Sequence, residues 1–436
     1  MKYSVVTFGC RVNQSDSLGF EEQLLEAGAR PAPAEEADVV VVNTCSVTAS
    51  ADQGGRQTIR RLARVNPSAR IIVTGCYATR EPGQVAALPN VARVVCNDDK
   101  PQLLSFIRTL GRDSSAEPSL GTAERFGEGD GTCGSPIEPG VAGRTAFTLR
   151  VQTGCAEACS YCIIPETRGA PRSVPIARLL DEVSRVVSAG FREVALTGVH
   201  LGSYGRDLQP GVTLPDLLTA LRDTFGDGGP GREPRVLFRI SSLEPMDCSP
   251  RIVSLVRDSP CFAPHFHLPL QHASRRVLSA MRRPYDVAYY ADLVGTIRRD
   301  LPNASIGSDI IVGFPGESDA DFEQLATYLE TSPLTHLHVF PYSDRPGTVA
   351  SRMTDRPAGL AVKERGRRVR EIGSRLTRRF LESQRGTVHT ALTLEDGTLA
   401  VTGNYLKVRI PPGRPRNRWV QVRVLETTPS VTGAVI

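Results

Sequence analysis

Six of the ten cysteines in this chain form two sets of three. The tight triad lies in the run GCAEACSYC and consists of Cys155, Cys159 and Cys162. The wide triad is spread over the N-terminal part of the chain and consists of Cys10, Cys45 and Cys76. Three thiolates hold three irons of a four-iron cluster and leave the fourth iron free to bind a substrate or cofactor, whereas four thiolates give a closed electron carrier. The two triads therefore predict two open [4Fe-4S] clusters that take part in chemistry.

Each triad also has a simpler interpretation. Three close thiols can hold a structural zinc ion, but zinc needs a fourth ligand, and no other Cys or His lies within twenty residues of the tight triad. A chance spacing is the other alternative. The wide triad can consist of small buried side chains, as free cysteines often do, although its flanks GCRVNQ, NTCSVT and TGCYA are polar and small. Four cysteines lack such a context and are interpreted as structural or as non-ligands: Cys96, Cys133, Cys248 and Cys261.

The elements around the wide triad explain how three distant cysteines can meet. Strands are predicted at residues 3–8, 38–43 and 70–74, and helices at residues 15–29 and 51–65. This βαβαβ pattern predicts a parallel sheet with right-handed crossovers. All three strands then end at the same edge, where ligand sites of open α/β sheets lie. Each cysteine of the wide triad follows one of these strand ends.

The tight triad follows the first of six further predicted strands. They cover residues 147–151, 193–196, 236–240, 265–268, 305–312 and 336–340, and helical segments such as 176–189, 214–223 and 287–300 follow most of them. This repeat predicts a barrel or partial barrel with its active site at the carboxyl ends of the strands. The strand ends are polar or rich in glycine: Thr197-Gly198, Ser241 to Glu244, Gln271-His272, Asp309 to Glu317 and Tyr342. Ordinary βα turns can give the same pattern.

Length and composition restrict the class of protein. A chain of 436 residues with 40% apolar content predicts two or three domains with real cores. No stretch approaches eighteen apolar residues, and the N-terminus MKYSVVTFGC lacks the layout of a signal peptide. Ten cysteines in such a chain fit a reducing compartment. We therefore expect a cytoplasmic protein with no membrane partner.

The C-terminal part is basic and changes its pattern. Residues 345–436 carry 18 basic and 7 acidic side chains, a net charge of +11, although the whole chain carries only +5. A basic helix is predicted at residues 361–380, followed by strands at 387–394, 398–410 and 418–425. These strands predict a small closed β-barrel of the kind that binds nucleic acids. The charge points to a bound polyanion, and a solvated Arg-rich surface is the alternative.

The spacing C-x3-C-x2-C after a first barrel strand resembles the signature of radical S-adenosylmethionine enzymes. In that family the cofactor chelates the free iron of the cluster and is cleaved reductively to a 5′-deoxyadenosyl radical. The resemblance implies that Thr197-Gly198 lie near the methionyl group, Glu244 in RISSLEP near the ribose, and the segment IIVGFPGE near the adenine. The implied cofactor-binding residues are Thr197, Gly198, Ser241, Glu244, Asp309, Gly313 and Gly316.

Together the two triads and the basic end resemble the methylthiotransferase family over nearly the full chain. The resemblance implies an N-terminal domain with the second cluster at residues 1–111, a linker at 112–143, a radical core built as a partial (β/α)6 TIM-like barrel at 144–375, and an RNA-binding TRAM barrel, similar to an OB fold, at 376–436. The second cluster, on Cys10, Cys45 and Cys76, carries the sulfur in that family. The phrases GCRVNQ, LTGVHLGSYGRDL and HVFPYSDRPGT are most similar to the branch that acts on threonylcarbamoyladenosine in tRNA. QHAS at residues 271–274 departs from the more usual QSGS and leaves details of the substrate pocket open.

The resemblance implies that carbon 2 of the modified adenosine beside the anticodon receives a methylthio group. It also implies tRNA, an electron donor such as flavodoxin or ferredoxin, and a sulfur source as partners. Six basic residues are predicted to contact RNA phosphates: Arg367, Arg368, Arg378, Arg379, Lys407 and Arg409. Three alternatives stay open: isopentenyladenosine as the tRNA substrate, an aspartate of a ribosomal protein as the substrate, and an iron–sulfur RNA-binding protein without catalysis.

Overall fold

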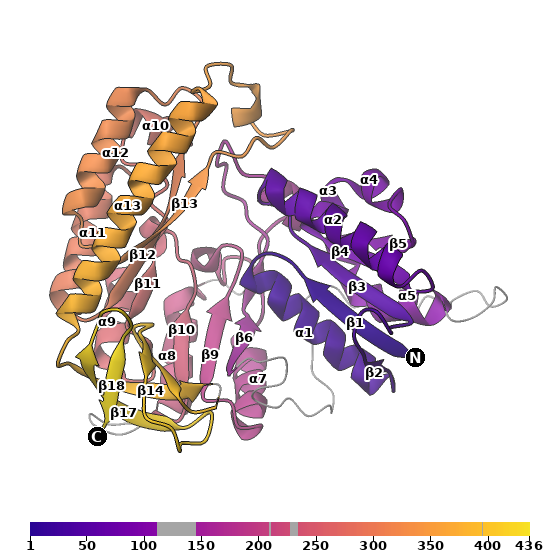
Figure 1. The fold of residues 1–436 in the computed structure, drawn as a ribbon, viewed down its shortest axis with the longest axis horizontal. Helices are drawn as coiled ribbons and strands as arrows, with labels where there is room; N and C mark the ends of the chain where they lie inside the picture. The colour runs from indigo at the N-terminus through magenta and orange to yellow at the C-terminus, as the bar shows by residue number, and fades with distance from the viewer. Residues whose placement is uncertain (111–144, 209–210, 227–233, 395) are drawn as a thin grey trace.

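In the computed structural model, which describes residues 1–110, 145–208, 211–226, 234–394 and 396–436, three units follow one another along the chain. Figure 1 shows an N-terminal sheet domain in indigo and purple beside an open barrel of parallel strands, and a small closed barrel in yellow at its lower end. The linker expected at residues 112–143, with Cys133, lies outside the described residues. No described helix combines the length and apolar character that crossing a membrane requires.

The N-terminal domain is a parallel five-stranded sheet between two layers of helices. Its strands, in the spatial order β2-β1-β3-β4-β5, are β1 (Lys2–Thr7), β2 (Arg30–Pro31), β3 (Val39–Thr44), β4 (Arg70–Gly75) and β5 (Val91–Val95). Its helices are α1 (Arg11–Glu26), α2 (Ala49–Val65), α3 (Cys76–Arg80), α4 (Pro82–Ala86), η1 (Asn97–Gln102) and α5 (Leu103–Leu110). The valines of β3 pack alternately into the two core layers, which is why this strand is apolar without alternation.

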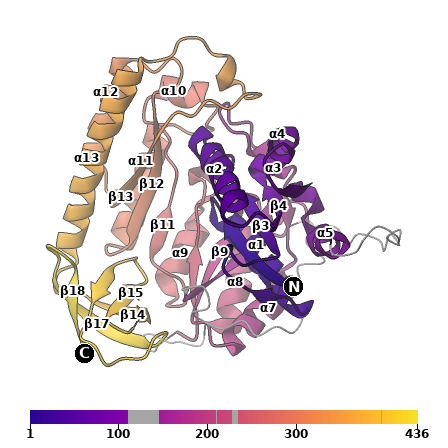
Figure 2. The ribbon, with the colours of Figure 1, turned by 45° about the vertical axis from the view of Figure 1, so that its right-hand side comes forward.

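The second unit is a six-stranded open barrel. Its strands are β6 (Ala146–Arg150), β9 (Glu193–Thr197), β10 (Leu237–Ile240), β11 (His265–His267), β12 (Ser305–Val312) and β13 (His336–Pro341). They form two parallel sheets, β6-β9-β10 and β11-β12-β13, which a single bridge between Phe238 and Phe262 joins. The barrel is therefore open between β6 and β13. Figure 2 shows the sheet of β11, β12 and β13 on one side, and β9 with the N-terminal domain on the other.

Helices cover the outside of this open barrel. They are α7 (Ile176–Ser188), α8 (Leu214–Phe225), α9 (Pro250–Asp258), α10 (Arg275–Ala280), α11 (Val287–Asp300) and α12 (Asp319–Thr331). Short elements connect them: β7 (Gln152–Thr153), α6 (Ile164–Arg168), β8 (Arg172–Ser173), η3 (Leu201–Ser203), η4 (Pro245–Asp247) and η5 (Ala350–Arg352). One continuous core of helix and strand side chains confirms the predicted strand-and-helix repeat.

The C-terminal unit is a closed five-stranded barrel in the order β14-β15-β16-β18-β17. Its strands are β14 (Val388–Leu394), β15 (Leu399–Thr402), β16 (Lys407–Arg409), β17 (Trp419–Glu426) and β18 (Thr432–Val435). The single strand predicted at 398–410 was wrong, because a turn in which Tyr405 has a φ of 66° divides it in two. The closed barrel itself was predicted correctly.

One long helix connects the open barrel to the closed one. Helix α13 (Gly359–Ser383) packs along β13 and α12 and runs across the boundary expected at residues 375 and 376. The closed barrel also contacts the open barrel directly, since the Arg239 guanidinium donates to the carbonyl of Gly403 at 2.6 Å and Asn404 Nδ2 donates to the carbonyl of Asn303 at 2.7 Å. These contacts fix the closed barrel against the lower end of the strands.

Candidate active site

The tight triad is built on one short loop after β7. Gly154 begins the loop with a φ of 77°, and a Cβ there would lie 1.9 Å from the carbonyl oxygen of Ala170. The loop closes on itself, because the Cys155 amide donates to Gly169 and the Cys162 amide donates to the carbonyl of Cys159. The three thiols are free and half-buried. Burial raises the pKa of Cys162 to about 12, so a positive charge is needed to hold it as a thiolate.

Side chains of the open barrel surround this loop. Arg283, whose side chain is 2% exposed, donates to Cys159 Sγ at 3.3 Å and forms an ion pair with Glu244. His200 hydrogen-bonds Asp247 at 2.9 Å through Nε2 and lies against Cys155. Burial opposes the protonation of His200, but these two contacts outweigh it and raise the pKa to about 10. Sequence reasoning found Glu244 but missed Arg283 and His200, because nothing in their local spacing relates them to the triad.

The wide triad forms at the carboxyl edge of the N-terminal sheet, as predicted. Cys10 precedes α1, Cys45 follows β3 and Cys76 begins α3. Gly9 has a φ of 91°, and a Cβ there would lie 2.6 Å from the Cβ of Cys45, so only glycine lets these two loops approach so closely. Cys45 and Cys76 are buried, whereas Cys10 is exposed.

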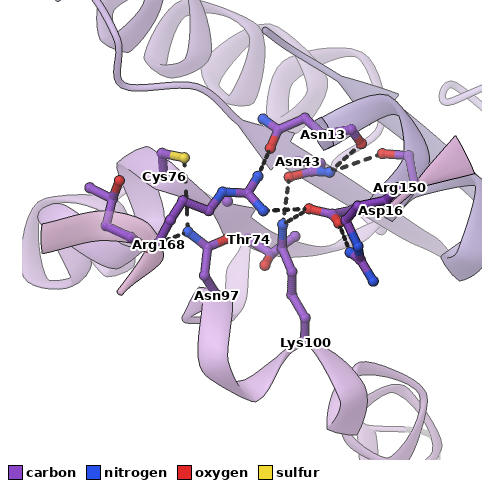
Figure 3. Close-up of polar contacts among 12 residues, drawn as sticks. Asn13, Asp16, Asn43, Thr74, Cys76, Asn97, Lys100, Arg150 and Arg168 are labelled. Carbon is purple, nitrogen blue, oxygen red and sulfur yellow. Dashed lines mark hydrogen bonds and ion pairs between the residues drawn. The ribbon is translucent and has the colours of Figure 1, made fainter. Parts of the chain in front are cut away.

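A buried charge network joins the wide triad to the open barrel. Asp16 of α1 accepts from Lys100 of η1, from Arg150 of β6 and, at 3.0 Å, from Arg168 of α6. Figure 3 shows these cations converging on Asp16 from both domains, with Arg168 lying between Asp16 and Cys76. All four side chains are at most 10% exposed. The three cations outweigh the effect of burial and hold the pKa of Asp16 below its usual value.

The same network positions the cysteine loops. Arg168 also donates to Asn13, whose Nδ2 donates to the carbonyls of Phe8 at 2.8 Å and Thr44 at 2.9 Å, beside Cys10 and Cys45. Burial by itself would raise the pKa of Cys76, but the charges of Arg168 and Lys100 outweigh it and lower this pKa. Positive charge from the barrel therefore favours the thiolate form of a cysteine in the other domain.

A second cross-domain ion cluster flanks the wide triad near Cys45. Asp52 of α2 pairs with Arg80 at 2.7 Å and with Arg345, which follows β13 in the open barrel. Arg345 also donates to the hydroxyl of Ser46 at 3.1 Å. The residue after Cys45 is thus fixed by the barrel, and the wide triad lies at the domain interface.

A cavity of about 880 Å³ extends from the wide triad into the open barrel. Gly9 to Val12 form one wall, Thr197, Gly198 and Ser241 to Ser242 lie at the strand ends, and Asn404 to Leu406 of the closed barrel form the lower end. The volume lies in the range of sites that bind small molecules or cofactors. Cys10 therefore faces the same space as residues that follow barrel strands β9 and β10.

Four of the seven histidines of the chain line this cavity, on strands β11 and β13. Asp309 of β12 lies between them and accepts from His267 at 3.0 Å and from His338 at 3.1 Å. Hydrogen bonds from these two imidazoles help to hold the pKa of Asp309 below its usual value despite burial. Sequence reasoning did not single out these histidines, although their alternation in HFH and HLH places them on one face of each strand.

The predicted cofactor-binding residues fall into two groups in space. Thr197, Gly198, Ser241 and Asp309 line the cavity, and Glu244 lies beside the tight triad. Gly313 and Gly316 lie instead in the turn after β12, where Gly313 packs against Val362 of α13 and the carbonyl of Gly316 accepts from Arg276. They are not among the cavity-lining residues.

The predicted RNA-binding residues also differ in their surroundings. Arg367 forms ion pairs with Glu364 and Glu371, Arg368 pairs with Glu323, and Arg379 donates to the carbonyl of Ser332. Arg378 is exposed beside a groove between α13 and residues 427–429, and Lys407 and Arg409 are exposed on β16. Within the described part of the chain, no ion pair occupies these last three cations.

The donor sets fit iron–sulfur clusters better than zinc. Zinc bonds to sulfur at 2.3 Å in tetrahedral sites hold the sulfurs about 3.8 Å apart. Among the described residues, the ligand atoms of His267, Asp309 and His338 all lie within 4.8 Å of one another, but the three sulfurs of neither triad lie that close together. Thr153 Oγ1, two residues before Cys155, and Ser241 Oγ, in the cavity wall, are buried without hydrogen-bond partners in the described chain, so each is free to bond a polar ligand atom.

Two parts of the chain match known protein families. Residues 149–329 match the Radical SAM superfamily, and residues 2–97 match the Uncharacterized protein family UPF0004. Among solved structures, the radical S-adenosylmethionine methyltransferase TsrM from Kitasatospora setae superimposes with a TM-score of 0.56 at 14% identity, over 80% of this chain and 74% of that one. The radical enzyme OxsB superimposes with a TM-score of 0.51 at 11% identity, over 86% and 56%. Fold and triad define a radical S-adenosylmethionine enzyme.

Curated relatives narrow the class. The threonylcarbamoyladenosine tRNA methylthiotransferase MtaB of Aquifex aeolicus is 36% identical over 94% of this chain and 96% of its own length, and that of Bacillus subtilis is 34% identical over 92% and 88%. A tRNA-2-methylthio-N(6)-dimethylallyladenosine synthase of Nitratidesulfovibrio vulgaris is 34% identical over 88% and 84%. The chain belongs to the radical S-adenosylmethionine methylthiotransferase family and is an enzyme.

Proposed function

We propose that this enzyme adds a methylthio group at carbon 2 of N6-threonylcarbamoyladenosine beside the anticodon of a tRNA. The names of the curated relatives in Aquifex aeolicus and Bacillus subtilis support the substrate. A radical is required because the hydrogen on this aromatic carbon is neither acidic nor activated, so no side-chain base removes it easily.

The observation that carries the proposal is the shared cavity. Cys10 of the wide triad and Thr197, Gly198 and Ser241 after the barrel strands line the same space. A sulfur held at the wide triad and a cofactor held over the strand ends can therefore reach one substrate.

Each triad has a distinct proposed role. Cys155, Cys159 and Cys162 would hold one [4Fe-4S] cluster and Cys10, Cys45 and Cys76 a second, with S-adenosylmethionine near Thr197, Gly198, Ser241, Glu244 and Asp309. When bound, the first cluster would supply reductive cleavage of one cofactor molecule to a radical, the second would carry the sulfur, and a further cofactor molecule would supply the methyl group. Arg283 donates to Cys159 and holds Glu244, so this chain aligns the cofactor site with the tight triad. An electron donor such as flavodoxin or ferredoxin, and a sulfur source, complete the reaction.

We propose that the closed barrel and α13 bind the phosphates of the anticodon stem and loop. Arg378, Lys407 and Arg409 are exposed cations without ion pairs in the described chain and are the strongest candidates. Arg367 and Arg368 must first leave their glutamates, which lowers their gain from a phosphate. Contacts of this kind position an RNA without reading its sequence.

Dimethylallyladenosine in tRNA is the second candidate substrate, because a relative that makes its methylthio derivative is 34% identical. The cavity argues against it. Its wall carries Arg11, four histidines, Asp309 and several hydroxyl groups, whereas a dimethylallyl group is apolar and gains nothing from them. The aspartate of a ribosomal protein would not need the exposed cations of the closed barrel.

Nucleoside mass spectrometry tests the proposal. Transfer RNA from cells that lack this protein should contain threonylcarbamoyladenosine without its methylthio derivative, and the complementing gene should restore the derivative. Loss of the methylthio derivative of dimethylallyladenosine instead would establish the second candidate.

A further inference from the structure

Arg11, the residue after Cys10, contributes a guanidinium group to the cavity wall. It begins α1, is half-buried, and lines the cavity with Gly9, Cys10 and Val12. Its side chain reaches across to the closed barrel, where it donates to the hydroxyl of Tyr405. Tyr405 is itself fixed, because Arg239 lies 3.7 Å from the centre of its ring and His265 packs edge-on at 4.5 Å. Arg11 is therefore held at a defined position between the wide triad and the end of the cavity.

The charge of Arg11 is not balanced by a carboxylate in the described chain. The other charged groups of the cavity have charged or hydrogen-bonding partners. Arg239 forms an ion pair with Glu193 at 2.8 Å, and Asp309 accepts from His267 and His338. The Tyr405 phenol is neutral and compensates none of the charge. A half-buried cation with one neutral partner interacts strongly with any anion that enters, since the surrounding dielectric is lower than that of water.

The two tRNA substrates of the curated relatives differ in one chemical property that this cation can detect. The threonylcarbamoyl group ends in the carboxylate of threonine, whereas the dimethylallyl group carries neither charge nor a hydrogen-bonding atom. Guanidinium groups bind carboxylates through parallel, charge-assisted hydrogen bonds. We propose that Arg11 binds the carboxylate of the N6 substituent and thereby selects threonylcarbamoyladenosine, an inference that rests on the proposed function.

The position of Arg11 beside Cys10 fits this role. Carbon 2 and the N6 substituent of adenine lie on the same edge of the base, on either side of N1. A base that points this edge towards the wide triad places its substituent next to whatever surrounds the triad. Because Arg11 directly follows Cys10 in the chain, the contact that binds the substituent also places carbon 2 next to the wide triad.

Binding experiments without turnover test this inference. We compare the reconstituted holoenzyme, without reductant, bound to tRNA that carries threonylcarbamoyladenosine and to the same tRNA with unmodified adenosine. Each affinity is measured for wild type, Arg11→Gln, Arg11→Lys and the control Arg108→Gln, which removes an exposed charge on α5 away from the cavity. The ratio of the two affinities within one protein is independent of the fraction that is correctly folded.

Wild type should prefer the modified tRNA. Arg11→Gln should reduce this preference by about tenfold or more, the effect of one hydrogen bond to a charged group, while its affinity for unmodified tRNA stays within about twofold. Arg11→Lys should retain much of the preference, and Arg108→Gln all of it.

Two results would overturn the inference. An unchanged preference in Arg11→Gln would mean that the guanidinium does not contact the substituent. An equal loss of affinity for both tRNAs would make Arg11 a phosphate contact. If wild type holds both clusters but does not methylthiolate the threonylcarbamoyladenosine tRNA, the proposed function fails, and this inference fails with it.

Discussion

The tight and wide triads place three thiols each at strand ends of parallel sheets, but they are assembled in different ways. The tight triad lies on one loop, and hydrogen bonds within that loop, from Cys155 to Gly169 and from Cys162 to Cys159, fix its shape. The wide triad takes one cysteine from each of three strand ends, and the side chains that fix its loops include Arg168 and Arg345 from the open barrel. One site is local in the chain and the other depends on the contact between domains.

This difference has an energetic consequence. Asp16 and its three cations are almost inaccessible to water, so removal of Asp16 would leave Lys100 and Arg168 buried without the carboxylate that they share. At the tight triad two buried cations lie beside the sulfurs, and each has its own carboxylate: Arg283 pairs with Glu244 and His200 with Asp247. We therefore expect the wide triad to fail when the domain interface is disturbed, while the tight triad survives.

The largest effects should come from removing either set of ligands. Changing Cys155, Cys159 and Cys162 together to Ala should remove about half of the iron and abolish cleavage of S-adenosylmethionine, because the cofactor loses its iron. Changing Cys10, Cys45 and Cys76 should also remove about half of the iron but leave cofactor cleavage intact and abolish sulfur transfer. Iron and sulfide analysis with 5′-deoxyadenosine assays measures both. Full iron content in either variant would refute the ligand assignment.

Breaking the buried ion pairs between the N-terminal domain and the open barrel should destabilise the wide triad. Asp16→Asn removes the carboxylate that Lys100 and Arg168 share in a buried site, and breaking a buried ion pair of this kind should cost about 3–5 kcal/mol of unfolding free energy. The iron of the wide triad should be lost first, and cofactor cleavage should remain. Denaturant unfolding and iron content report the two effects.

The matched control for that variant is Asp98→Asn. Asp98 pairs with Arg172 across the same interface at 3.0 Å, but its side chain is 73% exposed. Exposed ion pairs contribute about 0–1 kcal/mol, so this variant should unfold like wild type and keep both clusters. Similar losses of unfolding free energy and iron in both variants would mean that burial of the Asp16 network does not increase the cost of removing its carboxylate.

Single glycine substitutions should separate the triads with smaller effects. Gly154→Ala forces a Cβ against the carbonyl of Ala170, and Gly9→Ala forces one against Cys45, each at a positive φ. A left-handed conformation costs a residue other than glycine about 1–2 kcal/mol before the clash is added. Each variant should lose iron from its own triad only, as spectroscopy of the remaining cluster should show. Loss of both clusters in either variant would contradict independent assembly.

The smallest effects should come from the RNA-binding cations, which lie outside both triads. Neutralising Arg378, Lys407 and Arg409 should weaken tRNA binding for all sequences and make the logarithmic salt dependence shallower by about 0.7–0.9 per lost phosphate contact. Both clusters and cofactor cleavage should be unchanged. Arg367→Gln with Arg368→Gln should have less effect, because these cations are already paired. An unchanged salt slope would leave this surface without a role in RNA binding.

Much of this architecture could be predicted because it depends on local patterns. Fully apolar runs such as Val39–Val42 and the cysteines behind them predict a parallel sheet with a site at its edge, and the structure confirms that edge. The basic helix and the closed barrel were predicted in the same way. The turn at Tyr405 and strand β18 were missed, since short strands in a small barrel depend on pairing rather than on their own composition.

The sequence by itself determined the two triads of candidate ligand cysteines and the class of fold that presents them, because thiol spacing and strand periodicity are properties of neighbouring residues. Only the tertiary structure decided that Arg168 reaches Cys76, that Arg283 reaches Cys159, and that Arg11 shares a cavity with Tyr405. These pairs are separated by 92, 124 and 394 residues. The packing of one domain against another, and not any periodicity in the chain, selects which charges meet in space.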